Sequence, residues 1–91
     1  MIQQVIVVEN KLGLHARAAA KLVQLTSRFR SDIHVSKEGH QQSIDCKSIL
    51  GILMLAASKG SRLILSINGI DEAEAGAAIG ELFAAKFGEE S

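Results

Sequence analysis

Strand-like and helix-like hydrophobic patterns alternate along the whole chain, and their order limits the folds that it can adopt. Four segments are rich in β-branched residues or alternate apolar with polar side chains, which favours strands: residues 2–8, 33–36, 41–44 and 61–67. Three segments carry apolar side chains near helical spacing or lie between helix start and stop signals: residues 16–29, 46–60 and 71–87. The order β-α-β-β-α-β-α predicts an α/β two-layer sandwich, with helices on one face of the sheet and solvent on the other.

The chain is short, with 91 residues, and we expect one domain that spans residues 1–91. A chain of this size buries only about 60 to 65% of the surface that its unfolded form exposes, so its core is modest. Apolar residues make up 47% of the sequence, with three Phe and no Trp or Tyr. Aliphatic side chains must therefore fill most of the interior.

Several residues are suited to begin or end the expected helices. Ser48 is a good N-cap for the second helix, and Lys59 with Gly60 is suited to end it. Asp71 can cap the third helix, and Lys86 lies late enough to complement the helix dipole. The last four residues, GEES, are expected to fray.

Charge and cysteine content exclude several classes of function. Ten basic residues balance ten acidic ones, which leaves no basic surface signature for nucleic acid. The longest apolar run, ILMLAA, is much shorter than the roughly 18 residues that a membrane-spanning helix needs, so we expect no membrane insertion. Cys46 is the only cysteine, and a single thiol favours a cytoplasmic protein over a disulfide-bonded secreted one.

No metal or cofactor is expected. His34 and His40 lie in or near the predicted hairpin, without acidic or thiol partners at ligand spacing, and are interpreted as surface residues. The sequence also lacks a glycine-rich phosphate loop, so turnover of a small substrate by a free-standing enzyme is not favoured.

The segment NKLGLHARAAAKL contains the strongest candidate for chemistry. A helix that begins at Ala16 places His15 at its N-cap, beside backbone amides that have no partner within the helix. Those of Ala16 and Arg17 can bind phosphoryl oxygens, and the Arg17 guanidinium can add a bidentate contact. Imidazole is available as a free base near neutral pH, which suits a transient phosphoryl carrier. The same spacing is also compatible with a purely structural helix start and a solvated arginine.

With this segment, the chain resembles the HPr-like phosphocarrier proteins of the bacterial phosphoenolpyruvate-dependent phosphotransferase system. GLHAR is similar to the active-site signature of that family, and KSILGILMLAASKG is similar to its second-helix motif. The resemblance covers nearly the whole chain, with the motifs in the right order. It implies an open-faced sandwich of four antiparallel strands covered on one face by three helices.

The resemblance also implies roles for residues and partners. His15 would accept a phosphoryl group on Nδ1 from the phosphohistidine of enzyme I and pass it to a histidine of an EIIA domain, while Arg17 steadies the group. Ser48 aligns with the serine that HPr kinase/phosphorylase modifies in many members. As a plain N-cap, Ser48 would contribute about 1 kcal/mol without any regulation.

The resemblance further implies a docking surface beside His15. Leu50 and Leu53 would form an exposed apolar patch with Ala20 at its edge. The other residues of the expected surface are Ile49, Arg17, Lys21 and Lys47. Ile52 and Met54 are interpreted as core residues. Because two partners would use one face in turn, we expect a monomer.

One position departs from the family pattern. Many members carry proline where this chain has Ala18, and HARAAA resembles proteobacterial forms whose systems often serve regulation. Alanine can begin the same helix, so the chemistry is expected to persist. A regulatory docking module of the same fold, which acts without carrying phosphate, is the alternative function; retention of His15 and Arg17 argues against it.

Overall fold

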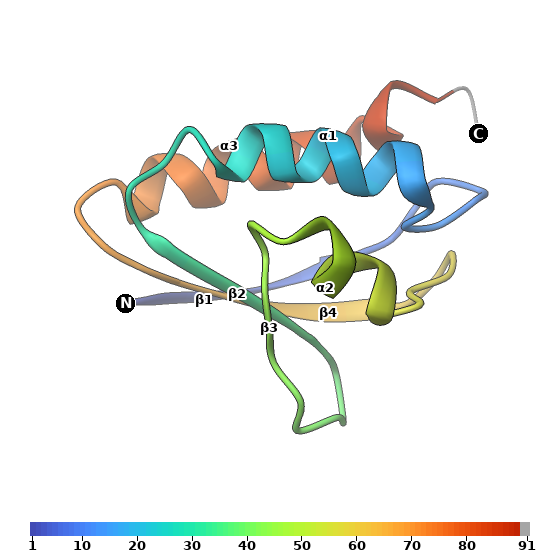
Figure 1. Ribbon diagram of the computed structural model, residues 1–91, viewed down its shortest axis with the longest axis horizontal. Helices are drawn as coiled ribbons and strands as arrows, with labels where there is room; N and C mark the ends of the chain where they lie inside the picture. The colour runs from blue at the N-terminus through green and yellow to red at the C-terminus, as the bar shows by residue number, and fades with distance from the viewer. Residues whose placement is uncertain (90–91) are drawn as a thin grey trace.

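Four strands form one antiparallel sheet in the computed structural model, which describes residues 1–89 (Figure 1). Their order across the sheet is β1-β4-β2-β3, so the first and last strands in sequence lie next to each other. The bounds are β1 Ile2–Val7, β2 Asp32–Lys37, β3 Ile44–Asp45 and β4 Arg62–Asn68. Pairing Ile2 with Ile67 and Val35 with Leu65 places the apolar residues of neighbouring strands side by side.

Helices cover one face of this sheet (Figure 1). They are α1 Ala16–Thr26, α2 Ile49–Met54 and α3 Glu72–Ala84, followed by the 3-10 turn η1 Lys86–Gly88. The helix α1 contacts both α2 and α3, and α3 packs on β1 and β4. The predicted element order and the open-faced sandwich are therefore confirmed.

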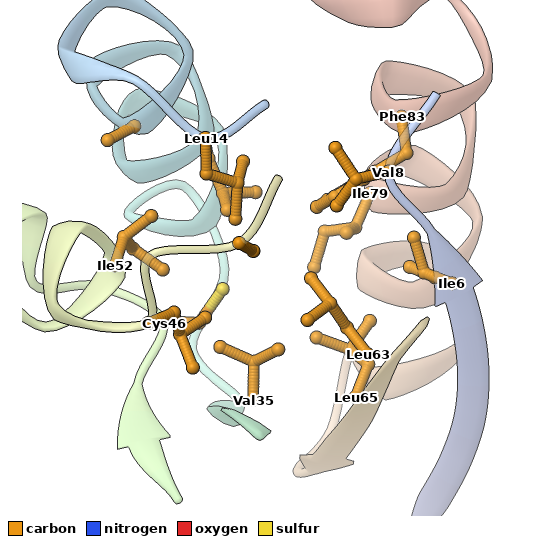
Figure 2. Close-up of a cluster of buried hydrophobic side chains, with 14 of the residues drawn as sticks. Ile6, Val8, Leu14, Val35, Cys46, Ile52, Leu63, Leu65, Ile79 and Phe83 are labelled. Atoms are coloured by element: carbon orange, nitrogen blue, oxygen red, sulfur yellow. The ribbon is translucent and has the colours of Figure 1, made fainter. Parts of the chain in front are cut away.

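The core lies between the sheet and the helices (Figure 2). Alternation along the strands buries one set of side chains and exposes the other, as the period of two requires. On β1, Ile6 is buried while Val5 and Val7 on the opposite face are exposed. The largest buried core side chains are Phe87, Leu22, Ile33, Ile52, Leu63, Leu65, Ile67 and Ile79.

The first helix ends earlier than its apolar pattern predicts. The hydroxyl of buried Thr26 donates to the Cys46 carbonyl at 2.9 Å and draws the end of α1 toward the next part of the chain. The amides of Arg28 and Phe29 then bond carbonyls three residues back, which is the geometry of tight turns. Phe29 still packs against the core. The apolar pattern therefore predicted which side chains are buried, but it overestimated the length of the helix.

The second helix is also shorter than expected, because it has only six residues and does not reach Lys59 or Gly60. The chain leaves the helix after Leu55, where Ala56 adopts a left-handed backbone with φ of 50°. Gly60 instead forms the turn before β4, and its amide donates to the Val8 carbonyl.

The second arm of the expected hairpin is wrong in position and length. Of the expected arm, residue Ile44 pairs with β2, together with Asp45 that follows it, and residues 41–43 are exposed outside any strand. The polar sequence QQS has no apolar side chain to bury. Pairing of this segment with the sheet would therefore gain no stabilisation from packing.

Asp71 occupies the N-cap position of α3, as predicted, but its side chain makes no cap hydrogen bond. Its carboxylate accepts hydrogen bonds from the amides of Arg30 and Ser31 and from the Ser31 hydroxyl, across the turn that precedes β2. Lys86 lies beyond the end of α3, with φ of 55°, and therefore cannot complement the last turn of that helix. Phe87 nevertheless continues the apolar line of α3 into the core.

Candidate functional site

The loop between β1 and α1 fixes where α1 begins. Gly13 has φ of 67°, and a Cβ atom there would lie 2.5 Å from the Ala57 carbonyl oxygen, so only glycine fits. The next residue, Leu14, is buried and its amide donates to the same carbonyl at 2.9 Å. This anchoring carries the chain from the core directly to His15.

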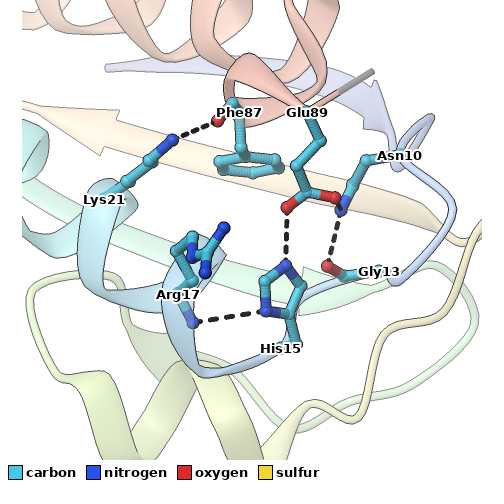
Figure 3. Close-up of polar contacts among 7 residues, drawn as sticks. All are labelled: Asn10, Gly13, His15, Arg17, Lys21, Phe87 and Glu89. Atoms are coloured by element: carbon cyan, nitrogen blue, oxygen red, sulfur yellow. Dashed lines mark hydrogen bonds and ion pairs between the residues drawn. The ribbon is translucent and has the colours of Figure 1, made fainter. Parts of the chain in front are cut away.

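His15 is the N-cap of α1. Its backbone is extended, with φ of −78° and ψ of 179°, and Nδ1 accepts the Arg17 amide at 3.3 Å (Figure 3). Ala16 and Arg17, whose amides belong to the first helical turn, are exposed. The sequence therefore placed the imidazole and these amides together, as expected for a residue one position before the helix.

The other ring nitrogen of His15 contacts a residue that the sequence reasoning missed. Nε2 lies 2.6 Å from Oε2 of Glu89, and Oε1 of the same carboxylate accepts from Asn10 at 3.1 Å (Figure 3). The hydrogen bond from His15 lowers the pKa of the Glu89 carboxyl below its usual value. Glu89 is therefore an anion at neutral pH.

Glu89 belongs to the terminal segment that was expected to fray. Gly88 and Glu89 are instead held in place, because the preceding Phe87 is buried and its carbonyl accepts from the Lys21 ammonium at 2.5 Å. Residues 90 and 91 of that segment lie outside the described residues. The apolar line that continues to Phe87 was the available signal that the next residues would be ordered.

The two contacts of His15 assign its proton. Because the Arg17 amide donates to Nδ1, that nitrogen carries the lone pair, and the proton lies on Nε2, facing the Glu89 carboxylate. A neutral imidazole in this tautomer can attack an electrophile through Nδ1 at the N-terminus of α1. The ring lines a shallow depression of about 410 Å³ whose other lining residues are Lys11, Leu12, Arg17 and Glu89.

An exposed apolar patch is formed by four residues of α2. Ile49, Leu50, Leu53 and Met54 are 45%, 69%, 38% and 65% exposed, while Ile52 is fully buried. The interpretation of Met54 as a core residue is wrong, because the short α2 turns only the Ile52 side of its surface toward the core. We call these four residues the α2 patch.

The remaining predicted docking residues are less exposed than the α2 patch. Ala20, Lys21 and Lys47 are partly buried. The Lys21 ammonium donates to the Phe87 carbonyl, and that of Lys47 to the Phe29 carbonyl at 2.8 Å. Both lysines thus fasten neighbouring elements together as well as supplying positive charge.

Ser48 caps α2. Its hydroxyl accepts the Gly51 amide at 3.1 Å, which is the ordinary N-cap bond. The side chain is partly buried next to the α2 patch. His15 at the start of α1 and the α2 patch therefore lie on two helices that contact each other.

Comparison with protein families gives one match over most of the chain. A family model described as "PTS HPr component phosphorylation site" matches residues 2–85. A phosphocarrier protein HPr from Cupriavidus necator is 49% identical over 89 residues, which is 98% of each chain. One from Xylella fastidiosa is 45% identical over 91 residues, the full length of both.

Solved structures agree with these sequence relatives. The crystal structure of HPr from Thermoanaerobacter tengcongensis superposes with a TM-score of 0.93 and 45% identity, covering both chains completely. A dimer of HPr from the same organism gives a TM-score of 0.76 over 98% of this chain and 100% of the other. No helix among residues 1–89 is both long and apolar enough to cross a membrane.

Proposed function

The chain belongs to the HPr family of phosphocarrier proteins of the bacterial phosphotransferase system, and we propose that His15 is the residue on which it carries the phosphoryl group. The observation that carries this proposal is the state of the imidazole at the start of α1. Nδ1 holds a lone pair beside the first helical amides, while Nε2 is bound to Glu89.

The chemistry follows from that arrangement. The Nδ1 lone pair attacks phosphorus, and the bond between phosphorus and the donor nitrogen breaks with its electron pair returning to the donor. The Arg17 amide, which donates to Nδ1 in the resting protein, then donates to a phosphoryl oxygen. The positive end of the α1 dipole and the Arg17 guanidinium stabilise the added negative charge.

We propose phospho-enzyme I as the donor and a histidine of an EIIA domain as the acceptor. The α2 patch supports this, because transient partners dock on exposed apolar surfaces with charged rims. Arg17, Lys21 and Lys47 are the basic residues proposed for that rim, and Ala20 lies at its edge. Because both partners would use this one face, we propose that the carrier is a monomer. Its single cysteine supports a cytoplasmic location.

We also propose that phosphorylation of Ser48 by HPr kinase/phosphorylase regulates docking. The Ser48 hydroxyl lies beside the α2 patch, so a phosphate there would add nearly two negative charges to the proposed partner surface. The same phosphate would replace a cap bond at the start of a helix, where negative charge is tolerated. Phosphorylation of Ser48 would therefore weaken the binding of partners more than it would change the stability of the fold.

The alternative, a docking module that regulates other proteins without carrying phosphate, needs only the α2 patch. It gives no role to the pair formed by His15 and Glu89 at 2.6 Å. The carrier function uses both features, and we therefore prefer it.

Labelling with phosphoenolpyruvate and enzyme I tests the proposed acceptor. The parent is expected to gain one acid-labile phosphate and His15→Ala none, while His40→Ala, which removes an exposed imidazole from the loop after β2, is expected to be labelled like the parent. Intact-protein mass spectrometry before and after acid treatment measures the result. Labelling of His15→Ala at the parent level would rule out this residue as the acceptor.

A further inference from the structure

We propose that Glu89 is a positioning residue for phosphoryl transfer, which keeps the proton of His15 on Nε2 while Nδ1 gains and loses phosphate. This inference rests on the proposed carrier function and adds a residue to its site. Glu89 lies 74 positions from His15 in the sequence and follows the last helical turn, where no pattern assigns it a role.

The contact is short and shielded. The distance from Nε2 to Oε2 is 2.6 Å, and the side chains of His15 and Glu89 are 27% and 15% exposed. The second carboxylate oxygen accepts from the amide nitrogen of buried Asn10, which also donates to the Gly13 carbonyl at 2.8 Å. Asn10 thus ties the carboxylate to the same loop that positions His15.

The backbone that delivers Glu89 is held in an unfavourable conformation. Lys86, Phe87 and Gly88 have φ of 55°, 57° and 78°, and the first two are residues that rarely adopt the left-handed region. Strained backbone of this kind persists only where the surroundings determine it. Here the Phe87 ring is buried against Phe83, with ring centroids 4.9 Å apart, and the Phe87 carbonyl is bound by Lys21.

This strain has a geometric result. Three left-handed residues in succession turn the chain back from the end of α3 toward the start of α1, where Glu89 meets the imidazole (Figure 3). A simple continuation of α3 would carry the chain onward instead. The buried Phe87 and the Lys21 bond therefore fix the position of a carboxylate as well as closing the core.

The chemical effect is on the charge of the ring. When Nδ1 forms its bond to phosphorus and the donor nitrogen leaves with the electron pair, the His15 ring still holds its Nε2 proton and becomes a phosphoimidazolium cation. An anion on that proton stabilises the cation, as the buried aspartate does for the histidine of serine proteases. The cation also releases its phosphoryl group more readily than the neutral ring does, which favours onward transfer.

Other charges near the ring do not replace this contact. Lys11 and Arg17 line the same depression, and Lys21 lies close enough to Glu89 to contribute to its lowered pKa. All three are cations and oppose positive charge on the imidazole. Among residues 1–89, the charged group bonded to the ring is the Glu89 carboxylate.

The test compares Glu89→Gln with the parent, using phosphoramidate as a small-molecule phosphoryl donor. Glutamine keeps the size of the side chain but removes its charge, and its single oxygen cannot serve both Asn10 and His15 as the two carboxylate oxygens do. Loading of His15 is expected to slow about 10-fold, comparable to the loss of an orienting partner behind a metal-bound histidine. Phosphorus-31 NMR of the loaded protein is expected to show the ring losing its Nε2 proton at a lower pH than in the parent.

The matched control is Glu81→Gln, which removes one exposed carboxylate from α3 away from the contact. It is expected to match the parent in both loading rate and titration. Circular dichroism establishes that all three proteins are folded. If Glu89→Gln equals the parent in both measurements, Glu89 has no positioning role; if only the rate falls and the titration is unchanged, its effect is not on the ring proton and the inference also fails.

These measurements need no protein partner. A parent protein that loads from phosphoramidate but takes no phosphate from enzyme I would contradict the proposed function, while the comparison with Glu89→Gln would still decide the role of Glu89.

Discussion

At the residue scale, the chemistry of the site depends on which groups around His15 are already engaged. Nδ1 and Nε2 both have partners, and Glu89 has two donors. The Arg17 guanidinium, by contrast, forms no ion pair with any residue in the described range 1–89, and the residue is exposed. Its charge is thus available to a transferred group and contributes little to the fold.

We therefore expect Arg17→Ala to slow phosphoryl transfer without changing stability. Loss of one preorganised charged donor should reduce the rate about 10- to 100-fold, because the arginine stabilises the negative phosphoryl oxygens while the group is shared between two nitrogens. Alanine is a good helix former, so the melting temperature should stay within about 2 °C of the parent. Rapid-quench transfer kinetics and thermal unfolding measure the two effects.

Arg28→Ala is the matched control, since it removes an exposed arginine after the end of α1. It should transfer phosphate at the parent rate. Normal kinetics with a lowered melting temperature in Arg17→Ala would assign that residue to structure instead.

At the scale of elements, the turns are fastened by bonds between distant parts of the chain. Asp71, at the start of α3, accepts from the Arg30 amide at 2.8 Å and from the Ser31 amide at 3.0 Å. Ser31 is buried, so its donors have no access to water in place of this carboxylate. The bond joins the turn before β2 to the turn before α3, and this replaces the cap hydrogen bond that Asp71 was expected to form.

The Asp71 contact predicts a pH-dependent contribution to stability. Hydrogen bonds from Ser31, and then from Arg30, lower the pKa of Asp71 from its ordinary value of 3.8. A group whose pKa is lowered by folding stabilises the protein above its ordinary pKa and loses that effect as the pH falls through the lowered value. Asp71→Asn should therefore melt at a lower temperature than the parent at pH 7, with a difference that shrinks below pH 3.8.

Thermal unfolding of the two proteins between pH 2 and 7 measures this effect. Asp32→Asn removes the same charge from an exposed aspartate on β2 and is the control for the loss of one negative charge. A difference between Asp71→Asn and the parent that is equal at every pH would contradict the role of the ionised carboxylate.

At the scale of the whole molecule, one end of the helical layer gathers the features of the carrier. The C-terminal turn packs beside the start of α1 (Figure 1), and α1 contacts α2 with its exposed patch. The sheet lies behind this layer and supports it. A change in charge on α2 is therefore expected to affect the association with a partner more than the phosphoryl chemistry at His15.

Ser48→Asp tests that expectation. Aspartate is itself a good N-cap, so the melting temperature should hold or rise slightly. The added carboxylate should slow transfer from enzyme I several-fold at low salt, and less at high salt, because charge at an interface rim acts mainly on association and is screened by ions. Transfer rates at several enzyme I concentrations and two salt concentrations give the answer.

Ser43→Asp places the same charge in the exposed loop after β2 and should transfer like the parent. If Ser48→Asp also matches the parent at every concentration, Ser48 is a structural cap and the regulatory proposal fails.

Local signals in the chain were enough to predict the order of the elements and the position of His15 at the start of a helix. Both depend on short-range properties: the period of apolar side chains, the turn at Gly13 and the small residues that follow His15. These signals act within a few residues, so they can be recognised without knowing how the chain packs. Resemblance to the family added the identity of the phosphorylated atom, which remains a proposal for this chain.

Contacts between residues far apart in the chain could not be predicted in this way, because they depend on packing. The length of α2 and the exposure of Met54 depend on how much of that helix the core accepts. Asp71 serves Ser31, 40 residues away, and Glu89 reaches His15 across 74 residues. Such contacts follow from the packing of α1, α3 and the buried Phe87, because a hydrogen bond across the fold forms only where the surrounding core holds both partners at bonding distance.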